Sequence, residues 1–517
     1  MIVWMVAVTA AIHARDIQTH IPIVELDFDT LSTDTFFVAN MRLITPSDTV
    51  IHTDTIIQVD STFVCDTIIR IDTTTLTDTI IRVDTIVLAD TIYTLNRICV
   101  SDTITHDTLR LNALIRHRGA TSIKYKKQSY AIKLTDSLGA KLDTSLLGMR
   151  NDNYWILDAM APDKARMRNR VAFDLWLDFS TKPYYYDKEP ELINGSRGQF
   201  VEVYTNGKYN GLYCLMERVD RKQLKLKKMK DWEIRGILYK SVRWKYGFFS
   251  VAIPRYDTQS DIWGCYEFQY PDTVDYIPWK PLYDHMRFAI TSSDEQFYEQ
   301  APKLYDLPVF IDLYLLNALL SARDCMGKNI FLSFRNIQKD STLVPTPWDI
   351  DHSFGRTYDG EEEDPETEFT GWALSLYPRL EQCDPSYIAS LNARYAALRR
   401  EQFDARALKE RFAGYFELFR QTGADHREEQ RWGGVNHIDL DFAAEEQYIY
   451  DWIDKRLAFC DKYFNYFSAV TTSLPEQSNA QTTDPINTPS VSKQLTNGHL
   501  YFRIGEQLYD IQGRLLR

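Results

Sequence analysis

A six-residue repeat constrains what the N-terminal part of this chain can fold into. Asp recurs, followed by Thr or Ser, at positions 48, 54, 60, 66, 72, 78, 84 and 90, and the register resumes at 102. Six is an even number, so an extended chain places every Asp on one face, whereas a helix of 3.6 residues per turn would scatter them. Enrichment in Thr, Ile and Val also favours β-structure. Residues 48–108 are therefore predicted to form an extended, β-type repeat stalk.

Two interpretations of this stalk remain open. Asp-Thr or Asp-Ser followed by Ile, Val, Leu or Thr resembles the acceptor motif for O-glycosylation in Bacteroidetes, which would place glycans on Thr49, Thr55 and Thr67. The alternative is a plain spacer, in which Asp and Thr keep a β-rich sequence in solution. A calcium-binding lattice is disfavoured because no oxygen-rich loop with a glycine turn is present.

The first residues indicate the compartment. Residues 1–14 form a short apolar run that ends in small residues, which fits the hydrophobic part of a secretory signal peptide. The positive n-region is missing, so the true start is expected upstream; a buried N-terminal strand is the alternative. No later run of about twenty apolar residues exists, which excludes an ordinary transmembrane span. We therefore expect a secreted, periplasmic or cell-surface protein, with residues 15–47 as an N-terminal segment.

Composition excludes several classes of protein. With 44% hydrophobic and 13% aromatic residues over 517 positions, the chain can bury a substantial core. Its net charge of -13 argues against a nucleic-acid binder, because phosphate backbones attract an excess of Lys and Arg. The seven cysteines are scattered without a Cys-x-x-Cys pair, so neither a zinc site nor a dense disulfide framework is indicated.

Two polar segments have a spacing typical of phosphoryl-transfer sites. Asp324 and Asn329 form a D-x-x-x-x-N pattern after an apolar helix-like run, and Asp349 and Asp351 follow a strand-like run over 340–347. Phosphoryl transfer needs a base beside the attacking hydroxyl and oxygen ligands for magnesium. Protein kinases place such residues at comparable positions, although the magnesium tripeptide is Asp-Ile-Asp here.

Nine further segments of the sequence, taken in order, resemble one known protein family. They are Arg118–Ser122, Lys126–Leu134, Leu146–Met149, Tyr154–Leu157, Arg168–Arg170, Phe200–Tyr213, Met216–Asp220, Leu315–Asn317 and Pro347–Gly355. Together and in this order they resemble the spore coat protein H (CotH) kinase family over roughly residues 110 to 465. The chain is identified as a secreted, Bacteroidetes-like member of that family.

The resemblance implies a fold and a set of site residues. The expected fold is α+β, a divergent bilobal protein-kinase-like domain over 109–467, preceded by the repeat stalk. Asp324 would accept the proton of the substrate hydroxyl, and Asn329, Asp349 and Asp351 would hold Mg²⁺.

Other residues are expected at the nucleotide. Arg118 would lie in the turn near the ATP phosphates, where the family's usual Asn is Ala120. Lys133 would contact the phosphates, with Lys240 as a second candidate. Glu217, at the junction of the lobes, would hydrogen-bond the nucleotide; a surface ion pair is the alternative.

Local patterns predict the main elements of the domain. Apolar spacing predicts a helix over 163–178, whose Arg166, Arg168 and Arg170 are expected in structural ion pairs ahead of phosphate contacts. Asn206-Gly207 predicts a hairpin turn. Strands are also predicted over 109–116, 129–134 and 329–333, with helices over 310–320 and through most of 385–467.

The remaining segments carry weaker signals. The acidic run 361–368 is expected to be a solvated loop near the mouth of the site, or a recruiter of a basic substrate. Residues 468–496 read as a linker from their Ser, Thr, Asn, Gln and Pro content. Residues 497–517 resemble a C-terminal sorting tail, with a terminal hairpin as the alternative.

The expected function follows from these residues together. A kinase-like phosphotransferase would move the γ-phosphate of ATP, with Mg²⁺, to a Ser or Thr hydroxyl of a protein substrate. A catalytically silent kinase-fold scaffold that binds a surface protein is the second hypothesis. A metal-dependent hydrolase using Asp324, Asp349 and Asp351 is the third, and the lack of a histidine cluster disfavours it.

Overall fold

The structure is a computed structural model that describes residues 21–51, 103–243, 255, 258–368, 376–466 and four short strands between 491 and 516. Two compact units, residues 1–467 and 468–517, are described separately below. The expected signal peptide, most of the repeat stalk and residues 468–490 of the expected linker lie outside the described residues, so these remain predictions; residues 491–496 of that linker form a strand.

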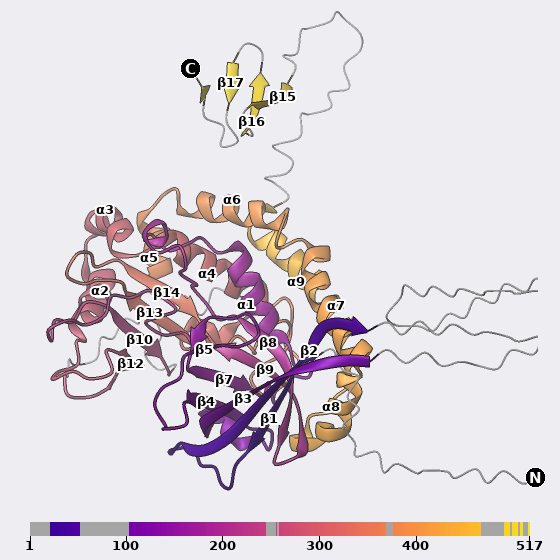
Figure 1. Cartoon of the computed structure of the whole chain (residues 1–517). Helices are drawn as coiled ribbons and strands as arrows, with labels where there is room; N and C mark the ends of the chain where they lie inside the picture. The colour runs from indigo at the N-terminus through magenta and orange to yellow at the C-terminus, as the bar shows by residue number, and fades with distance from the viewer. Residues whose placement is uncertain are drawn as a thin grey trace, which may run out of the picture. The chain divides into compact units, whose positions relative to one another are not determined.

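A closed seven-stranded barrel forms the first part of the larger unit (Figure 1). Its strand order is β1-β2-β3-β4-β7-β9-β8, and β1 closes the barrel by pairing in parallel with β8. The bounds are β1 Ile23–Asp27, β2 Phe37–Ile51, β3 Thr103–Arg118, β4 Ser129–Thr135, β7 Tyr154–Asp158, β8 Gly198–Thr205 and β9 Lys208–Glu217.

The barrel confirms the predicted strands but differs from the expected lobe. β3 and β4 pair as predicted, and Asn206 and Gly207 form the β8–β9 turn with φ of 50° and 75°. Closure depends on β1 and β2, from residues that the sequence analysis left outside the kinase-like domain. These strands join because their alternate side chains, such as Val24 and Met41, fill the barrel interior.

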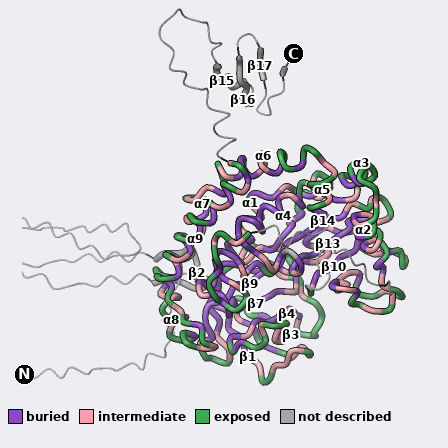
Figure 2. Tube along the Cα trace, turned by 180° about the vertical axis from the view of Figure 1, so that it is seen from behind, coloured by how far each residue is buried: buried purple, intermediate pink, exposed green. Residues whose placement is uncertain are grey.

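A mixed region follows the barrel. It contains a five-stranded sheet in the order β11-β12-β10-β13-β14. The bounds are β10 Ile237–Ser241, β11 Ile262–Trp263, β12 Tyr266–Tyr270, β13 Ile330–Phe334 and β14 Leu343–Pro347. The predicted apolar helix is α4 (Leu307–Leu320), which packs against β14 and is buried on nearly all sides (Figure 2). A two-stranded ribbon pairs β5 (Thr144–Ser145) with β6 (Asn151–Asp152).

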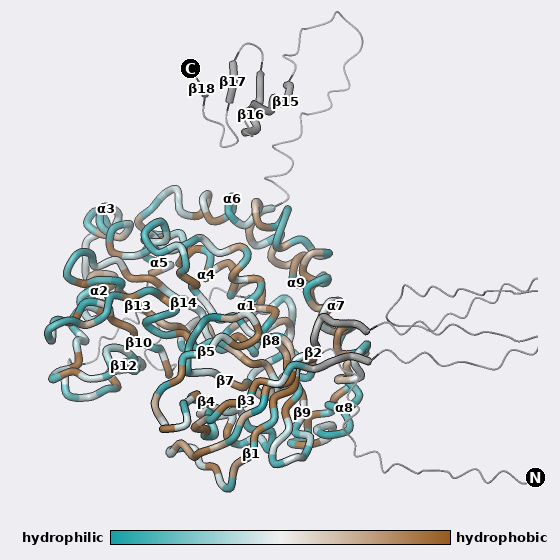
Figure 3. The backbone as a smooth tube through the Cα atoms, in the orientation of Figure 1, coloured by the Kyte–Doolittle hydropathy of each residue, from teal (hydrophilic) through white to brown (hydrophobic). Residues whose placement is uncertain are grey.

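Helices surround this sheet and one side of the barrel (Figure 1). They are α1 Arg168–Phe179, α2 Lys280–Thr291, α3 Asp294–Leu304, α5 Leu376–Cys383, α6 Tyr387–Arg399, α7 Ala405–Thr422, α8 Ala424–Trp432 and α9 Phe442–Tyr463. Helix α3 is largely hydrophilic, teal in Figure 3, and it buries only Phe297 and Ala301. None of the helices in the described part of the chain has the length and apolarity needed to cross a membrane.

Helix α1 begins five residues later than the sequence predicted. Oδ2 of Asp163 accepts hydrogen bonds from the backbone N–H groups of Met167 (2.8 Å) and Arg168 (2.7 Å). Arg166, directly before Met167, has a left-handed φ of 55°. The segment 163–167 is therefore a capping loop, because its backbone donors are satisfied by a side chain.

The arginines of this segment form buried ion pairs, as expected. Arg168 contacts Asp163 and Glu445, each at 2.6 Å. Arg166 contacts Glu428 of α8 at 2.7 Å, and Lys127 contacts the same carboxylate at 2.6 Å. These contacts attach the C-terminal helices to the barrel.

The smaller unit contains a four-stranded antiparallel sheet. Its strands are β15 Val491–Thr496, β16 His499–Ile504, β17 Gln507–Tyr509 and β18 Leu515–Leu516. The sorting role of this tail remains a prediction.

Candidate active site

The antiparallel pair β13–β14 brings the two predicted polar motifs together. Asn329 directly precedes β13 and Trp348 directly follows β14, and the register pairs Ile330 with Pro347. The Trp348 N–H donates to the Asn329 carbonyl at 2.9 Å, and the Asn329 amide donates to the Asp349 carbonyl at 3.4 Å. Residues twenty positions apart thus form one end of a sheet.

Asp324 lies in a short 3₁₀ turn, Arg323–Met326, that follows α4. Its Oδ2 is 2.8 Å from Lys328 Nζ and 2.8 Å from His352 Nδ1. Burial opposes ionisation here, but the hydrogen bonds and charges of His352 and Lys328 outweigh it and lower the pKa of Asp324 to about 2. Asp324 is therefore a carboxylate at neutral pH, fixed in place by two cations.

His352 connects two acidic groups, and the sequence analysis assigned it no role. Its Nε2 lies 3.4 Å from Asp351 Oδ1, while Nδ1 contacts Asp324. Burial works against its charge, yet Asp351 and then Asp324 raise the pKa of His352 to about 9. The only sequence signal was its position directly after Asp351, which is too weak to assign a role.

The carboxylates of Asp158, Asp349 and Asp351 lie close to one another, and Asp351 also contacts His352. Burial raises the pKa of Asp158, and the charge of Asp349 adds to the effect. Burial also raises the pKa of Asp351, an effect that His352 opposes and that Asp349 and Asp158 reinforce. The sequence analysis missed Asp158, which directly follows the Tyr154–Leu157 motif at the end of β7.

Backbone conformation and one amide orient these carboxylates. Asn329 and Asp349 both have left-handed φ values, 59° and 55°, which Asn and Asp tolerate better than most residues. Asn169 of α1 donates to Asp158 Oδ2 at 3.0 Å and accepts from the Ile350 N–H at 3.0 Å. Asn169 therefore couples the barrel to the Asp349 segment.

Two cations face this acidic group. The Arg118 guanidinium lies 5.8 Å from the centre of the Trp348 ring, and Lys240 Nζ lies 5.9 Å from it. Burial lowers the pKa of Lys240, and the charge of Asp349 partly offsets that effect. Arg118 thus lies within electrostatic reach of Asp158, and its contact with ATP phosphates remains a prediction.

Lys133 packs against two aromatic rings, and its contact with the phosphates remains a prediction. Its Nζ packs 4.3 Å from the Phe36 ring and 5.4 Å from the Tyr154 ring. Ile132 and Leu134 fill the barrel interior, so the alternation of β4 points Lys133 outward. Lys240, the second candidate, is the lysine that lies within electrostatic reach of Asp349.

Glu217 is held by contacts within the protein in this conformation, and its contact with the nucleotide remains a prediction. Its buried carboxylate accepts hydrogen bonds from the Arg150 N–H (2.8 Å), from Arg197 Nη2 (2.6 Å) and from Gln223 Nε2 (2.9 Å). These donors engage both oxygens. Glu217 thus forms the ion pair that was the alternative, with Arg197 as its partner. The pair is only partly at the surface, because the Arg197 side chain is exposed and the Glu217 side chain is buried.

The acidic run 361–368 is only partly a solvated loop. Glu363 is buried, accepts a hydrogen bond from Ser321 Oγ at 3.1 Å and lies 3.6 Å from Arg323. Most of its acidic neighbours are exposed. Glu363 thus anchors the run beside the loop that carries Asp324.

The donor set fits a magnesium ion that is brought by a nucleotide. In the part of the chain that the structure describes, no group of three or more His, Cys, Asp or Glu is arranged to hold a metal ion by itself. Mg²⁺ in phosphotransferases typically needs only one or two carboxylates, because phosphates and water complete its shell. Asp351 Oδ1 is buried and makes no hydrogen bond among the described residues, although His352 Nε2 lies 3.4 Å away, so this oxygen keeps a free lone pair for a cation.

Comparison with known proteins assigns the family. The family model for the CotH kinase protein matches residues 115–460, about two thirds of the chain. Comparison with curated proteins gives no match. The matched range includes Arg118, Asp158, Asp324, Asn329 and Asp349, the barrel strands from β4 onwards and the whole five-stranded sheet, but not β1 and β2. The chain therefore belongs to the CotH kinase family.

Proposed function

We propose that this chain is a phosphotransferase that uses Mg²⁺ and ATP to phosphorylate Ser or Thr hydroxyls of a protein substrate. One observation carries the proposal. The end of the β13–β14 pair holds an ionised carboxylate, Asp324, next to an acidic group that includes Asp349 and faces Arg118 and Lys240. A base, magnesium ligands and phosphate-binding cations are the parts that phosphoryl transfer requires.

Each residue has a distinct task in this proposal. Asp324 orients the incoming hydroxyl and accepts its proton. A pKa of about 2 suits a loose transition state, in which the proton leaves late and the carboxylate mainly positions the nucleophile. Lys328 and His352 fix the rotamer of Asp324. When bound, magnesium would neutralise phosphate charge, with Asp349, Asp351 and Asn329 as its protein ligands.

The remaining side chains act on the nucleotide or on the shape of the site. Arg118 and Lys240 supply positive charge opposite the carboxylates, where the phosphates would lie. Asn169 keeps Asp158 and the Ile350 backbone in register across the two halves of the site. The proposal also keeps the extracytoplasmic location, which rests on the apolar run of residues 1–14.

A silent scaffold is the second candidate, because the Lys133 ammonium packs on the Phe36 ring and the chain lacks a G-x-G-x-x-G loop. Transfer of radiolabelled phosphate from ATP, including autophosphorylation, separates the two. Asp324→Asn should slow transfer by about 10²–10⁴-fold at matched ATP occupancy. The control Asp451→Asn changes an exposed carboxylate of α9 and should leave the rate unchanged.

Two results would count against the proposal. Equal labelling by the wild type and Asp324→Asn would show that Asp324 is not the base. Tight Mg²⁺-ATP binding without labelling in any variant would favour the scaffold.

A further inference from the structure

A strained turn presents an exposed tryptophan in the larger unit. The Glu233 N–H donates to the Lys230 carbonyl at 2.8 Å, and the Lys230 N–H donates back to Glu233 at 3.2 Å. The two corner residues, Asp231 and Trp232, have φ of 51° and 62°. Such a turn normally has glycine at its second corner, since positive φ is unfavourable for a bulky residue. Trp232 nevertheless occupies this corner, with 69% of its surface exposed.

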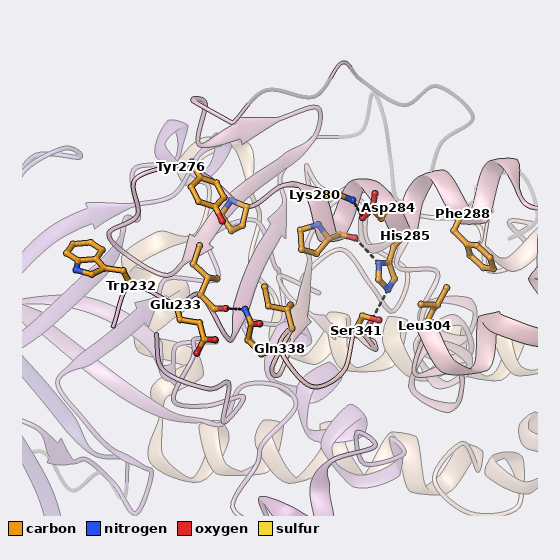
Figure 4. Close-up of a pocket in the computed structure, with 14 residues that line it drawn as sticks. Trp232, Glu233, Tyr276, Lys280, Asp284, His285, Phe288, Leu304, Gln338 and Ser341 are labelled. Carbon is orange, nitrogen blue, oxygen red and sulfur yellow. Dashed lines mark hydrogen bonds and ion pairs between the residues drawn. The ribbon is translucent and has the colours of Figure 1, made fainter. Parts of the chain in front are cut away.

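The turn borders a pocket of about 790 Å³ (Figure 4). The rings of Trp232 and Tyr276 lie toward one end of the pocket in this view, and Phe288 lies toward the other. Tyr276 is 54% exposed, so two aromatic rings are available to a ligand at the same end. A pocket of this size suits a small ligand or a few residues of a polymer.

The floor of the pocket is held by hydrogen bonds. The His285 ring places Nδ1 2.7 Å from the Pro281 carbonyl and Nε2 2.7 Å from the Ser341 carbonyl. Gln338 Nε2 donates to the Ile234 carbonyl at 3.0 Å. These contacts connect α2 to the β13–β14 connection, so the pocket is formed before a ligand arrives.

The charges around the pocket are paired within the protein. Lys280 forms an ion pair with Asp284, and Glu233 forms one with Arg235 at 2.7 Å. The pocket thus combines exposed aromatic faces with polar groups but offers no unbalanced charge. A ligand that matches this surface is neutral, rich in hydroxyl groups and apolar on its ring faces.

We propose that this pocket binds a neutral carbohydrate, which stacks on Trp232 and Tyr276 and hydrogen-bonds to the polar rim. The strain and exposure at Trp232 both reduce stability, and a binding role explains why the ring is there. Gln338 and Ser341 lie in the β13–β14 connection, whereas Asn329 and Asp349 flank the opposite end of the strands. Five strand residues span about 17 Å, so this binding site is independent of the proposed chemistry.

Titration calorimetry on the full chain tests the proposal, with cellohexaose, maltohexaose and chitohexaose as probes and a ten-residue polyproline peptide as the competing class. At least one sugar should bind, and Trp232→Gly and Tyr276→Ala should each weaken its binding at least tenfold. Trp232→Gly should also raise the melting temperature, because glycine relieves the positive φ. Tyr298→Ala removes an equally exposed ring on α3, outside the pocket, and should leave binding unchanged.

Several outcomes would overturn the carbohydrate site. These are no binding of any of the three sugars, sugar binding that survives Trp232→Gly, or binding of polyproline alone, which would assign the pocket to a peptide. A lower melting temperature for Trp232→Gly would indicate that Trp232 is there for stability.

Discussion

At the scale of single residues, the site depends on which lysine faces the acidic group. Lys133 matched the expected strand motif, but its ammonium packs on two aromatic rings of the barrel's outer side. Lys240 comes from a strand of the other sheet and lies near Asp349, with its pKa lowered by burial. Lys240, Arg118 and Asp349 therefore define where phosphates would be bound.

Substituting the two lysines in turn tests this assignment. Lys240→Ala should weaken ATP binding about tenfold or more, because a partly desolvated ammonium opposite the phosphates is lost. Lys133→Ala should change ATP affinity less than threefold. Equilibrium titration with a fluorescent ATP analogue in the presence of Mg²⁺ measures both. The opposite order of effects would return the phosphate contact to Lys133.

The sequence predicted which candidate residues lie close together wherever their relative position depends on local structure. Asp324, Asn329 and Asp349 were found because a helix, a turn and two adjacent strands determine their relative positions. Asp158 and Lys240 are distant in sequence, and only the pairing of β10 with β13 and the packing of α1 bring them to the same place. No local pattern reports such contacts, so Asp158 was missed and Lys240 was ranked second.

At the scale of elements, one buried carboxylate connects α8 to the barrel. Glu428 of α8 accepts hydrogen bonds from Lys127, from Arg166 and from the Leu212 N–H of β9, at 2.6 to 2.7 Å. Its side chain is fully buried. The predicted helical region after residue 385 is thus attached to the barrel by one carboxylate whose partners are 216 to 301 residues away in the sequence. Only the tertiary structure could reveal this contact.

Removing this carboxylate should destabilise the whole larger unit. Glu428→Ala removes the carboxylate that neutralises two buried cations and leaves them with carbonyl partners alone, a change that costs about 3–5 kcal/mol. Glu417→Ala on α7 removes an exposed partner of Arg420 and should cost less than about 1 kcal/mol. Urea unfolding of both variants measures the difference. Similar losses of stability would mean that α8 is not held through Glu428.

The buried carboxyl group of Asp306, at the start of α4, should make the stability of the fold depend on pH. Burial raises the pKa of Asp306 to about 6, and its carboxylate accepts a hydrogen bond from the Tyr184 N–H at 2.8 Å. The folded state therefore binds the proton more tightly than the unfolded state, whose Asp pKa is about 3.9. The stability from this group is complete below about pH 4 and is lost as the pH rises through about 6.

Asp306→Asn isolates that effect, because asparagine keeps the acceptor and does not titrate. Between pH 4.5 and 7.5 the wild type should lose about 2 kcal/mol of unfolding free energy relative to Asp306→Asn. Urea unfolding across this range measures it. A constant difference between the two proteins would show that the Asp306 carboxyl keeps an ordinary pKa.

At the scale of the whole molecule, the repeat interrupts the barrel rather than preceding it. β1 comes before the repeat, which begins at Asp48 within β2 and reaches Asp102 directly before β3, yet all three strands belong to one closed barrel. The register pairs Val50 with Ile104 and Ile51 with Thr103, so the chain leaves the barrel and returns at adjacent positions. The sequence showed the repeat but not this connectivity, because pairing across a long insertion leaves no local pattern.

This connectivity predicts that the repeat can be removed without loss of the fold. Because Ile51 and Thr103 are paired neighbours, replacing residues 52–102 with a four-residue Gly-Asn-containing turn should keep the melting temperature within a few degrees and leave ATP binding unchanged. Deleting residues 21–45 should instead abolish cooperative unfolding, because β1 and most of β2 are lost and the barrel is left open, with apolar positions exposed along new edges. Circular dichroism melts of both variants beside the full chain provide the comparison. A stable protein without residues 21–45 would mean that β1 and β2 are dispensable additions, and an unfolded protein without the repeat would mean that residues 52–102 contribute to the core.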